Sequence, residues 1–336
     1  MKRKASLAIS VLLILSLLCA GCSGGGGVQG GEEITDPINL TISVGESEDY
    51  YMSKFVAEWL ELITEKSDGK ITGKIFYNGQ AGGGTEAFEA LEMGNIQVYL
   101  DGDAMAGPIS NAFDVFGLPY LYDSKEHQYR FWDTYFTEVT DWLAEKSGIR
   151  VAGIIDGLNR EATMKYPVET LEGFRNVKIR VPATDSYVKI WETLGAAPIP
   201  INFYEVYTSI QTGVVDGQEN DIALSKEAGF TEVAPYVIMT DHTHYEGALY
   251  FDEIYWQGLP REAKDIILEA GNQVMKESRE YCGELEETIT AELKAEGVTF
   301  IYPDLTSFKE KCQVLYDNCT QCQDVLDWVD AARKEN

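Results

Sequence analysis

Short strand-like segments alternate with amphipathic helical segments between residue 38 and about residue 100. Residues 38–44 are β-branched and alternating, which is typical of a strand, and residues 50–69 carry apolar side chains at helical spacing before a glycine. Two further strands are predicted at 70–77 and 96–100, separated by a glycine turn and a helix with Thr85 as its N-cap. This order predicts an α/β lobe with a largely parallel sheet.

A second series of strands and helices begins near residue 148. From Pro260 to Gly297 the chain then has almost no helix breaker, which predicts a helix of about 35 residues, far above the usual length. No heptad stripe is sustained, so a coiled coil is disfavoured. We therefore expect an α/β, two-lobed clamshell of the periplasmic-binding-protein type, with a long helix spanning both lobes. The other segments predicted are strands at 149–155, 177–181, 197–201, 236–240, 248–256 and 298–302, and helices at 185–195, 204–213 and about 305–333.

The predicted division of the chain follows from these segments. Residues 1–22 are a lipoprotein signal peptide with its lipidation cysteine, and 23–37 form a flexible, glycine-rich tether. Lobe I takes 38–157 plus about 246–275, and lobe II takes 158–245 plus about 276–336. A ligand is expected between the lobes.

The N-terminus predicts export. Lys2, Arg3 and Lys4 precede an apolar run that is too short to span a membrane comfortably. The run ends in "LLCAGC", and small residues before Cys22 resemble a bacterial lipoprotein signal, although Cys19 stands where leucine is commonest. An ordinary cleaved signal peptide is the alternative. Either way the protein is extracytoplasmic; with Cys22 lipidated it is anchored to the cell membrane.

Charge and motifs exclude several function classes. The chain has 55 acidic and 27 basic side chains, a net charge of -28, which disfavours nucleic acid as a partner. It contains no G-x-S-x-G, no H-E-x-x-H and no complete phosphate loop, so no catalytic role and no cofactor are expected. His242 and His244 could hold a metal, but structural polar residues are the preferred interpretation and no metal is predicted.

Three segments carry a resemblance to a known family. They are "FRNVKIRVPATDSYVKIWETLGAAPIPINFYEVYTSIQTGVVDGQEN" (174–220), "GLPYLY" (117–122) and "TDH" (240–242). Over about 38–300 the chain resembles the DctP-type substrate-binding proteins of tripartite ATP-independent periplasmic (TRAP) transporters. The resemblance implies a receptor that binds a small organic acid and delivers it to a membrane permease without using ATP. The alternatives are an extracytoplasmic sensor or an ABC-type binding protein, with a hydrolytic enzyme less favoured.

The resemblance also implies the ligand-binding residues. Arg180, the arginine of the family's KIRVP motif, is expected to grip the carboxylate of the ligand, because a guanidinium fork matches both oxygens. Arg160 is a second anion contact, although Asn159 departs from the usual context. Asn220 is a further ligand contact. The first lobe is expected to contribute two acidic loops, 45–51 and 100–105, and from the first of them we add Glu46 as a ligand contact. Tyr245 is added as a wall of the site.

Polar residues near Asn220 and four late cysteines have structural interpretations. Asp216 and Glu219 are expected to be hydrogen-bonding anchors, because more carboxylates would repel an anionic ligand. Four late cysteines in an exported chain could form two disulfides, with three possible pairings. A stapled C-terminal helix is preferred to a redox or metal-binding pair at Cys319 and Cys322; the other two cysteines are Cys282 and Cys312.

Overall fold

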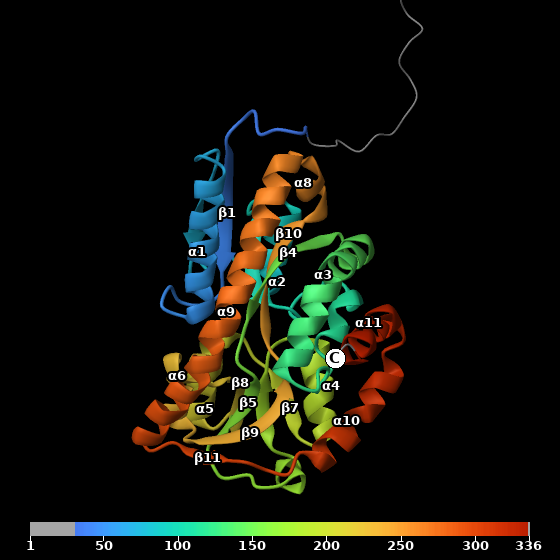
Figure 1. Cartoon of the computed structure of the whole chain (residues 1–336). Coiled ribbons are helices and arrows are strands. Elements are labelled where there is room, and N and C mark those ends of the chain that lie inside the picture. The colour runs from blue at the N-terminus through green and yellow to red at the C-terminus, as the bar shows by residue number, and fades with distance from the viewer. Residues whose placement is uncertain (1–30, 335–336) are drawn as a thin grey trace, which may run out of the picture.

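The structure is a computed structural model that describes residues 31–334. The predicted signal peptide, Cys22 and residues 23–30 of the predicted tether lie outside the described residues. Two sheets form the centres of two lobes, and a long helix runs along both (Figure 1). The predicted two-lobed α/β fold is therefore confirmed.

Lobe I is built on a five-stranded sheet in the order β2-β1-β3-β10-β4. β1 pairs in parallel with β2 and β3, whereas β10 is antiparallel to both β3 and β4. The strands are β1 (Ile38–Val44), β2 (Ile71–Phe76), β3 (Val98–Gly102), β4 (Ile149–Asp156) and β10 (Glu246–Asp252). The helices of this lobe are α1 (Tyr51–Lys66), α2 (Thr85–Glu92), α3 (Lys125–Ser147) and α8 (Glu253–Gly258), with a 3-10 turn, η1 (Asn111–Val115).

Lobe II is built on a six-stranded sheet in the order β11-β9-β5-β8-β6-β7. Its strands are β5 (Arg160–Met164), β6 (Lys178–Val181), β7 (Ala197–Pro200), β8 (Gly217–Asp221), β9 (Tyr236–Thr243) and β11 (Thr299–Ile301). Its helices are α4 (Asp185–Leu194), α5 (Val206–Thr212), α6 (Ile222–Glu227), α7 (Phe230–Val233) and α10 (Thr306–Asn318), with 3-10 turns η2 (Leu171–Phe174) and η3 (Phe203–Glu205). The chain passes between the sheets at 157–159 and again at 244–245.

The long helix α9 (Arg261–Ala295) has 35 residues, as predicted. It packs on β4 and α1 of lobe I and on α6 of lobe II, so it spans both lobes. Gly271 allows the helix to lie directly on β4, because a Cβ there would be 2.5 Å from the carbonyl oxygen of Ala152. The first described residues bind the N-terminus of this helix. The carbonyl oxygens of Gly31 and Glu32 accept hydrogen bonds from the backbone N–H groups of Arg261 and Glu262, which have no partner within the helix.

Several predicted elements differ from the structure. α3 was not predicted, although Ser124 caps its start and Gly148 ends it in a left-handed conformation. The predicted strand 248–256 ends at Asp252, because the Asp252 side chain accepts a hydrogen bond from Tyr255 N and starts α8. The N-cap of α2 is Gly84, not Thr85. β5 and β8 were also missed, since both are rich in polar residues.

The C-terminal segment is two helices rather than the single one predicted. α10 packs on α4 in lobe II, and α11 (Gln323–Lys334) packs on α3 in lobe I. A 3-10 turn, η4 (Thr320–Cys322), separates them, and a disulfide joins Cys319, the residue before the turn, to Cys322, its last residue. Cys282 and Cys312 are free and buried. The disulfide therefore lies at the bend between α10 and α11, and the choice between a structural staple and a redox pair stays a prediction.

Candidate functional site

Three adjacent strands of lobe II bring the predicted polar residues to one edge of the sheet. Arg160 begins β5 and pairs in antiparallel register with Asp221, the last residue of β8. β6 runs parallel to β8 on its other side, with Arg180 opposite Gln218. Because β8 and β6 end where β5 begins, Arg160, Arg180 and Asn220 lie at the same end of the sheet. All three are buried.

Arg160 is held by a carboxylate. Its Nε and Nη2 donate to Oε2 and Oε1 of Glu219 at 2.7 and 2.9 Å, and the pair is almost completely buried. The Nε2 of His242 lies 3.1 Å from the same Oε2. Burial opposes ionisation of Glu219, but the charge and hydrogen bonds of Arg160 outweigh it and hold the pKa of Glu219 below its usual value. The bidentate geometry fixes the Arg160 guanidinium in one orientation.

Arg180 has no such partner. Its Nε donates to the carbonyl oxygen of Ile201 at 2.8 Å, and within residues 31–334 no carboxylate forms an ion pair with it. The residue is only 4% exposed. Burial lowers the pKa of Arg180 to about 10; the negative charge of Glu219 opposes this effect, and the positive charge of Arg160 adds to it. The site thus holds a buried guanidinium whose charge is not balanced by a contacting acid.

The segment 205–221 is built as a helix, a glycine stop and a strand. α5 ends where Gly213 adopts a left-handed conformation (φ 79°), as predicted. Asp216 then accepts a hydrogen bond from the backbone N–H of Lys178, which ties this turn to β6. Glu219 and Asp216 therefore act as the predicted anchors. The amide Oδ1 of Asn220 accepts from Asp221 N at 3.2 Å.

Lobe I contributes an acidic side to this region. Glu46 follows β1 and Asp101 lies in β3, and both are half-buried. Burial, together with the negative charge of Asp101, raises the pKa of Glu46 to about 8. Asp101 accepts hydrogen bonds from the Tyr99 hydroxyl and from the Gly102 N–H.

Tyr245 links the two sides. Its ring lies 4.9 Å from the guanidinium carbon of Arg160, which is a cation–π contact. Burial is the main cause that raises the pKa of Tyr245, and the charges of Asp101 and Glu46 add to it. Tyr187 on α4, which was not predicted, lies at the same distance from Arg160, and its buried hydroxyl has no hydrogen-bond partner in the described part of the chain. Its position after a helix cap gave no signal in the sequence.

Direct hydrogen bonds hold the lobes against each other around these residues. The Tyr50 hydroxyl of lobe I donates to Oδ2 of Asp221 at 2.8 Å, and the Tyr204 hydroxyl of lobe II donates to the Gly45 carbonyl at 2.7 Å. The Ser47 hydroxyl also donates to Glu227. The polar residues at the edge of the lobe II sheet are thus enclosed between lobes that touch.

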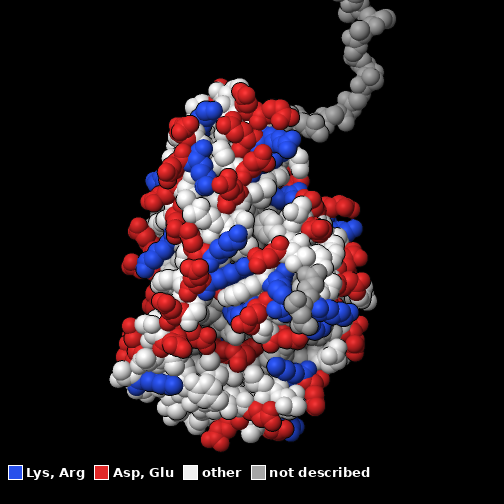
Figure 2. All heavy atoms as spheres, viewed as in Figure 1, with Lys and Arg blue, Asp and Glu red and all other residues white. Residues whose placement is uncertain are grey.

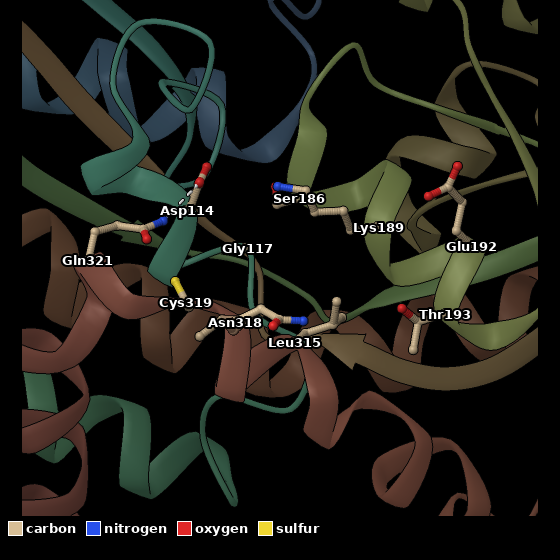
Figure 3. Close-up of a pocket in the computed structure, with 11 residues that line it drawn as sticks. Asp114, Gly117, Ser186, Lys189, Glu192, Thr193, Leu315, Asn318, Cys319 and Gln321 are labelled. Carbon is tan, nitrogen blue, oxygen red and sulfur yellow. Dashed lines mark hydrogen bonds between the residues drawn. The ribbon is translucent and has the colours of Figure 1, made fainter.

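A separate cavity of about 310 Å³ lies near the disulfide. Figure 3 shows residues converging on it from lobe I, from α4 and from the C-terminal segment, among them Asp114, Ser186 and Cys319. Gln321 donates to Asp114 across it at 3.3 Å. None of the predicted site residues lines this cavity.

The surface of the protein carries charges of both signs. Acidic and basic side chains are interspersed over the face shown in Figure 2, with acidic ones in excess. Among the described residues, no group of three or more His, Cys, Asp and Glu side chains could hold a metal ion. No helix in residues 31–334 is long and apolar enough to cross a membrane. His242 instead bonds to Glu219 and Thr240.

Comparison with known proteins gives a family. The model of "Bacterial extracellular solute-binding protein, family 7" (DctP) matches residues 42–322. The sialic acid-binding periplasmic protein SiaP of Vibrio cholerae serotype O1 is 31% identical over 281 residues, which is 83% of this chain and 86% of SiaP.

Solved structures agree with this result. A TRAP periplasmic solute-binding protein from Sulfitobacter sp. NAS-14.1 with bound β-D-galacturonate has a TM-score of 0.81 and 29% identity, covering 88% of this chain and all of its own. A similar protein from Pseudomonas putida F1 with bound D-glucuronate has a TM-score of 0.84, 23% identity and coverage of 89% and 99%, which shows the fold. The chain belongs to the family 7 extracellular solute-binding proteins, the solute receptors of TRAP transporters.

Proposed function

We propose that this receptor captures a small organic acid between its lobes through the Arg180 guanidinium and delivers it to a TRAP membrane permease. The observation that carries the proposal is the state of Arg180, a buried cation that, within residues 31–334, has one backbone hydrogen bond and no ion pair with a carboxylate. An unbalanced buried charge is costly, so a carboxylate brought by the ligand would complete the site.

The neighbours of Arg180 fit supporting roles in this scheme. Arg160 is largely neutralised by Glu219, so it contributes a fixed positive edge and its remaining donors rather than a full unpaired charge. The Asn220 amide carries two donors beside its bonded oxygen and suits a second oxygen or a hydroxyl of the ligand. Glu46 and Tyr245 would contact the part of the ligand that faces lobe I.

The names of the relatives support a carboxylate ligand. Sialic acid, named for SiaP, and the galacturonate bound in the Sulfitobacter protein both carry a carboxylate. Closure of the lobes would then be favoured by contacts that the ligand makes to both of them.

Substitution of Arg180 tests the proposal. Isothermal titration calorimetry of wild type with N-acetylneuraminate, D-galacturonate and D-glucuronate should identify at least one ligand. Arg180→Ala should weaken its binding at least about 100-fold, the loss expected for two charge-assisted hydrogen bonds. Arg175→Ala, an exposed arginine in the same lobe, is the matched control and should bind like wild type. Unchanged affinity in Arg180→Ala would contradict the assignment.

We also propose that Cys22 is lipidated and anchors the protein outside the cell. The support is the sequence alone, "LLCAGC" after a short apolar run. Metabolic labelling with an alkyne fatty acid should tag the wild type and should not tag Cys22→Ala. Equal labelling of both proteins would exclude this anchor, and labelling of neither would favour an ordinary cleaved signal peptide.

A further inference from the structure

A tyrosine at the edge of the interface between the lobes is exposed and yet bonded to the opposite lobe. Tyr204 belongs to the 3-10 turn η3 of lobe II, and the residue is 57% exposed. Its hydroxyl nevertheless donates to the carbonyl oxygen of Gly45 in lobe I at 2.7 Å. The polar end of an exposed side chain is thus held by the other half of the molecule.

Lobe I offers this hydroxyl a preformed notch, made by Gly45 and Gly79. The turn after β2 is tied to the end of β1 by two backbone hydrogen bonds, from the N–H groups of Asn78 and Gly79 to the carbonyl oxygens of Glu46 and Val44, at 2.7 and 3.0 Å. Both bonds lie within lobe I. A Cβ at Gly79 would lie 2.6 Å from the hydroxyl oxygen of the tyrosine, so the notch has room for that oxygen because residue 79 is glycine.

The segment of lobe II that carries Tyr204 also holds Arg180. The Nε of Arg180 donates to the carbonyl oxygen of Ile201 at 2.8 Å, at the start of this segment. The side chain of Asn202 then accepts a hydrogen bond from Tyr204 N at 3.1 Å and caps η3. The segment 201–204 therefore connects the unpaired guanidinium of the site to the contact with lobe I.

We infer that Tyr204 is a latch between the lobes: its hydroxyl enters the notch of Gly45 and Gly79 when the lobes close, and its departure from the notch sets how fast a bound acid leaves. This inference goes beyond the proposed function, and only its link to Arg180 rests on that function. The latch forms after a ligand has entered the open cleft, so it acts on dissociation and leaves association almost unchanged.

The expected size of the effect follows from the other contacts across the interface. The Tyr50 hydroxyl donates to Asp221 and the Ser47 hydroxyl to Glu227, and both bonds also join lobe I to lobe II. Loss of the latch should therefore loosen the closed form without preventing closure. A single net hydrogen bond corresponds to about 3- to 10-fold in an equilibrium constant.

Tyr204→Phe tests the latch because it removes the hydroxyl and keeps the ring. D-galacturonate, D-glucuronate and N-acetylneuraminate are each loaded on the protein, and their displacement is followed by stopped flow. Dissociation from Tyr204→Phe should be about 3- to 10-fold faster than from wild type, with association within about twofold. Tyr302→Phe, at another exposed tyrosine of lobe II, is the matched control and should release the acid at the wild-type rate. Equal dissociation rates for wild type and Tyr204→Phe overturn the inference.

Gly79→Ala tests the notch. The φ of Gly79 is 63°, so alanine at this position is strained whatever residue 204 is. The close contact of the new Cβ with the hydroxyl oxygen exists only when residue 204 is tyrosine. Gly79→Ala should therefore accelerate dissociation at least about 3-fold more in the wild-type background than in Tyr204→Phe. Equal effects in the two backgrounds would show that the glycine does not serve the tyrosine.

Measurements without ligand separate this inference from the proposed function. In small-angle X-ray scattering of the unliganded proteins, Tyr204→Phe should have a larger radius of gyration than wild type and Tyr302→Phe, because a bond that closes the lobes is lost. If none of the three acids binds, identical scattering curves overturn the latch. If Arg180→Ala binds an acid normally while Tyr204→Phe releases it faster, the latch stands and the assignment of Arg180 fails.

Discussion

The surroundings of Arg160 and of Arg180 differ although both residues lie at the same end of one sheet and are equally buried. The Arg160 guanidinium has a charged partner: Glu219 accepts hydrogen bonds from it, and His242 bonds to the same carboxylate. The Arg180 guanidinium has one backbone acceptor, and among the described residues no acid forms an ion pair with it. The first arrangement is what a framework needs, and the second is what a binding site needs, because only an unpaired group gains by meeting a ligand.

Replacing Arg160 should have the largest effect on stability. Arg160→Met leaves Glu219 buried without its main partner, which should cost about 3–5 kcal/mol of unfolding free energy. Urea denaturation of the unliganded protein at pH 7.5 measures it. Arg175→Met, at an exposed position, is the control for the methionine side chain and should change stability by less than about 0.5 kcal/mol. A cost below about 1 kcal/mol for Arg160→Met would remove the distinction drawn here.

His242 should have an intermediate effect. His242→Phe removes the hydrogen bond between His242 and Glu219 and leaves Thr240 Oγ1 without its ring partner, which should cost about 1–3 kcal/mol. The same denaturation experiment measures it. In an Arg160→Met background the loss should differ from the sum of the two single losses, since both residues bond to one carboxylate. Strict additivity would argue against a connected network.

Arg180→Met should be close to neutral for folding. The substitution removes a desolvated charge that has no acid partner, so the unfolding free energy should stay within about 1 kcal/mol of wild type or rise. Ligand binding should be lost in the same protein. A loss of stability as large as that of Arg160→Met would show that Arg180 is also part of the framework.

The smallest effect is expected at Glu46, and it depends on pH. Burial and Asp101 raise the pKa of Glu46 from 4.5 to about 8, so the folded protein holds this proton more tightly than the unfolded chain. The stability that this group contributes is therefore fully present below about pH 4.5, and it is lost as the pH rises from there to about 8. Compared with wild type, the unfolding free energy of Glu46→Gln should therefore increase by up to about 1 kcal/mol as the pH is raised from 5 to 9, and thermal unfolding at each pH measures it. If the variant instead became more stable relative to wild type as the pH was lowered, the prediction would be contradicted.

The sequence allowed more of the secondary structure around Arg160 and Arg180 to be predicted than of the contacts that these two residues make. β1, β2, β6, β7 and α9 were found because their apolar residues keep a regular period or because breakers bound them. β5 and β8 were missed because strands that carry Arg160, Glu219 and Asn220 inward have polar residues where the pattern demands apolar ones. Arg180 was reached through its motif, but its lack of an acid partner, and the pairing of Arg160 with Glu219, depend on long-range packing that no local pattern encodes.

The C-terminal bend has a mechanical consequence. The backbone passes between the lobes at 157–159, at 244–245, along α9, and once more where α10 on α4 gives way to α11 on α3. Four parallel links leave a pair of bodies few degrees of freedom, so their relative motion should approach rotation about a single axis. The open form would then be a narrow ensemble, and little orientational entropy would be lost when the lobes close.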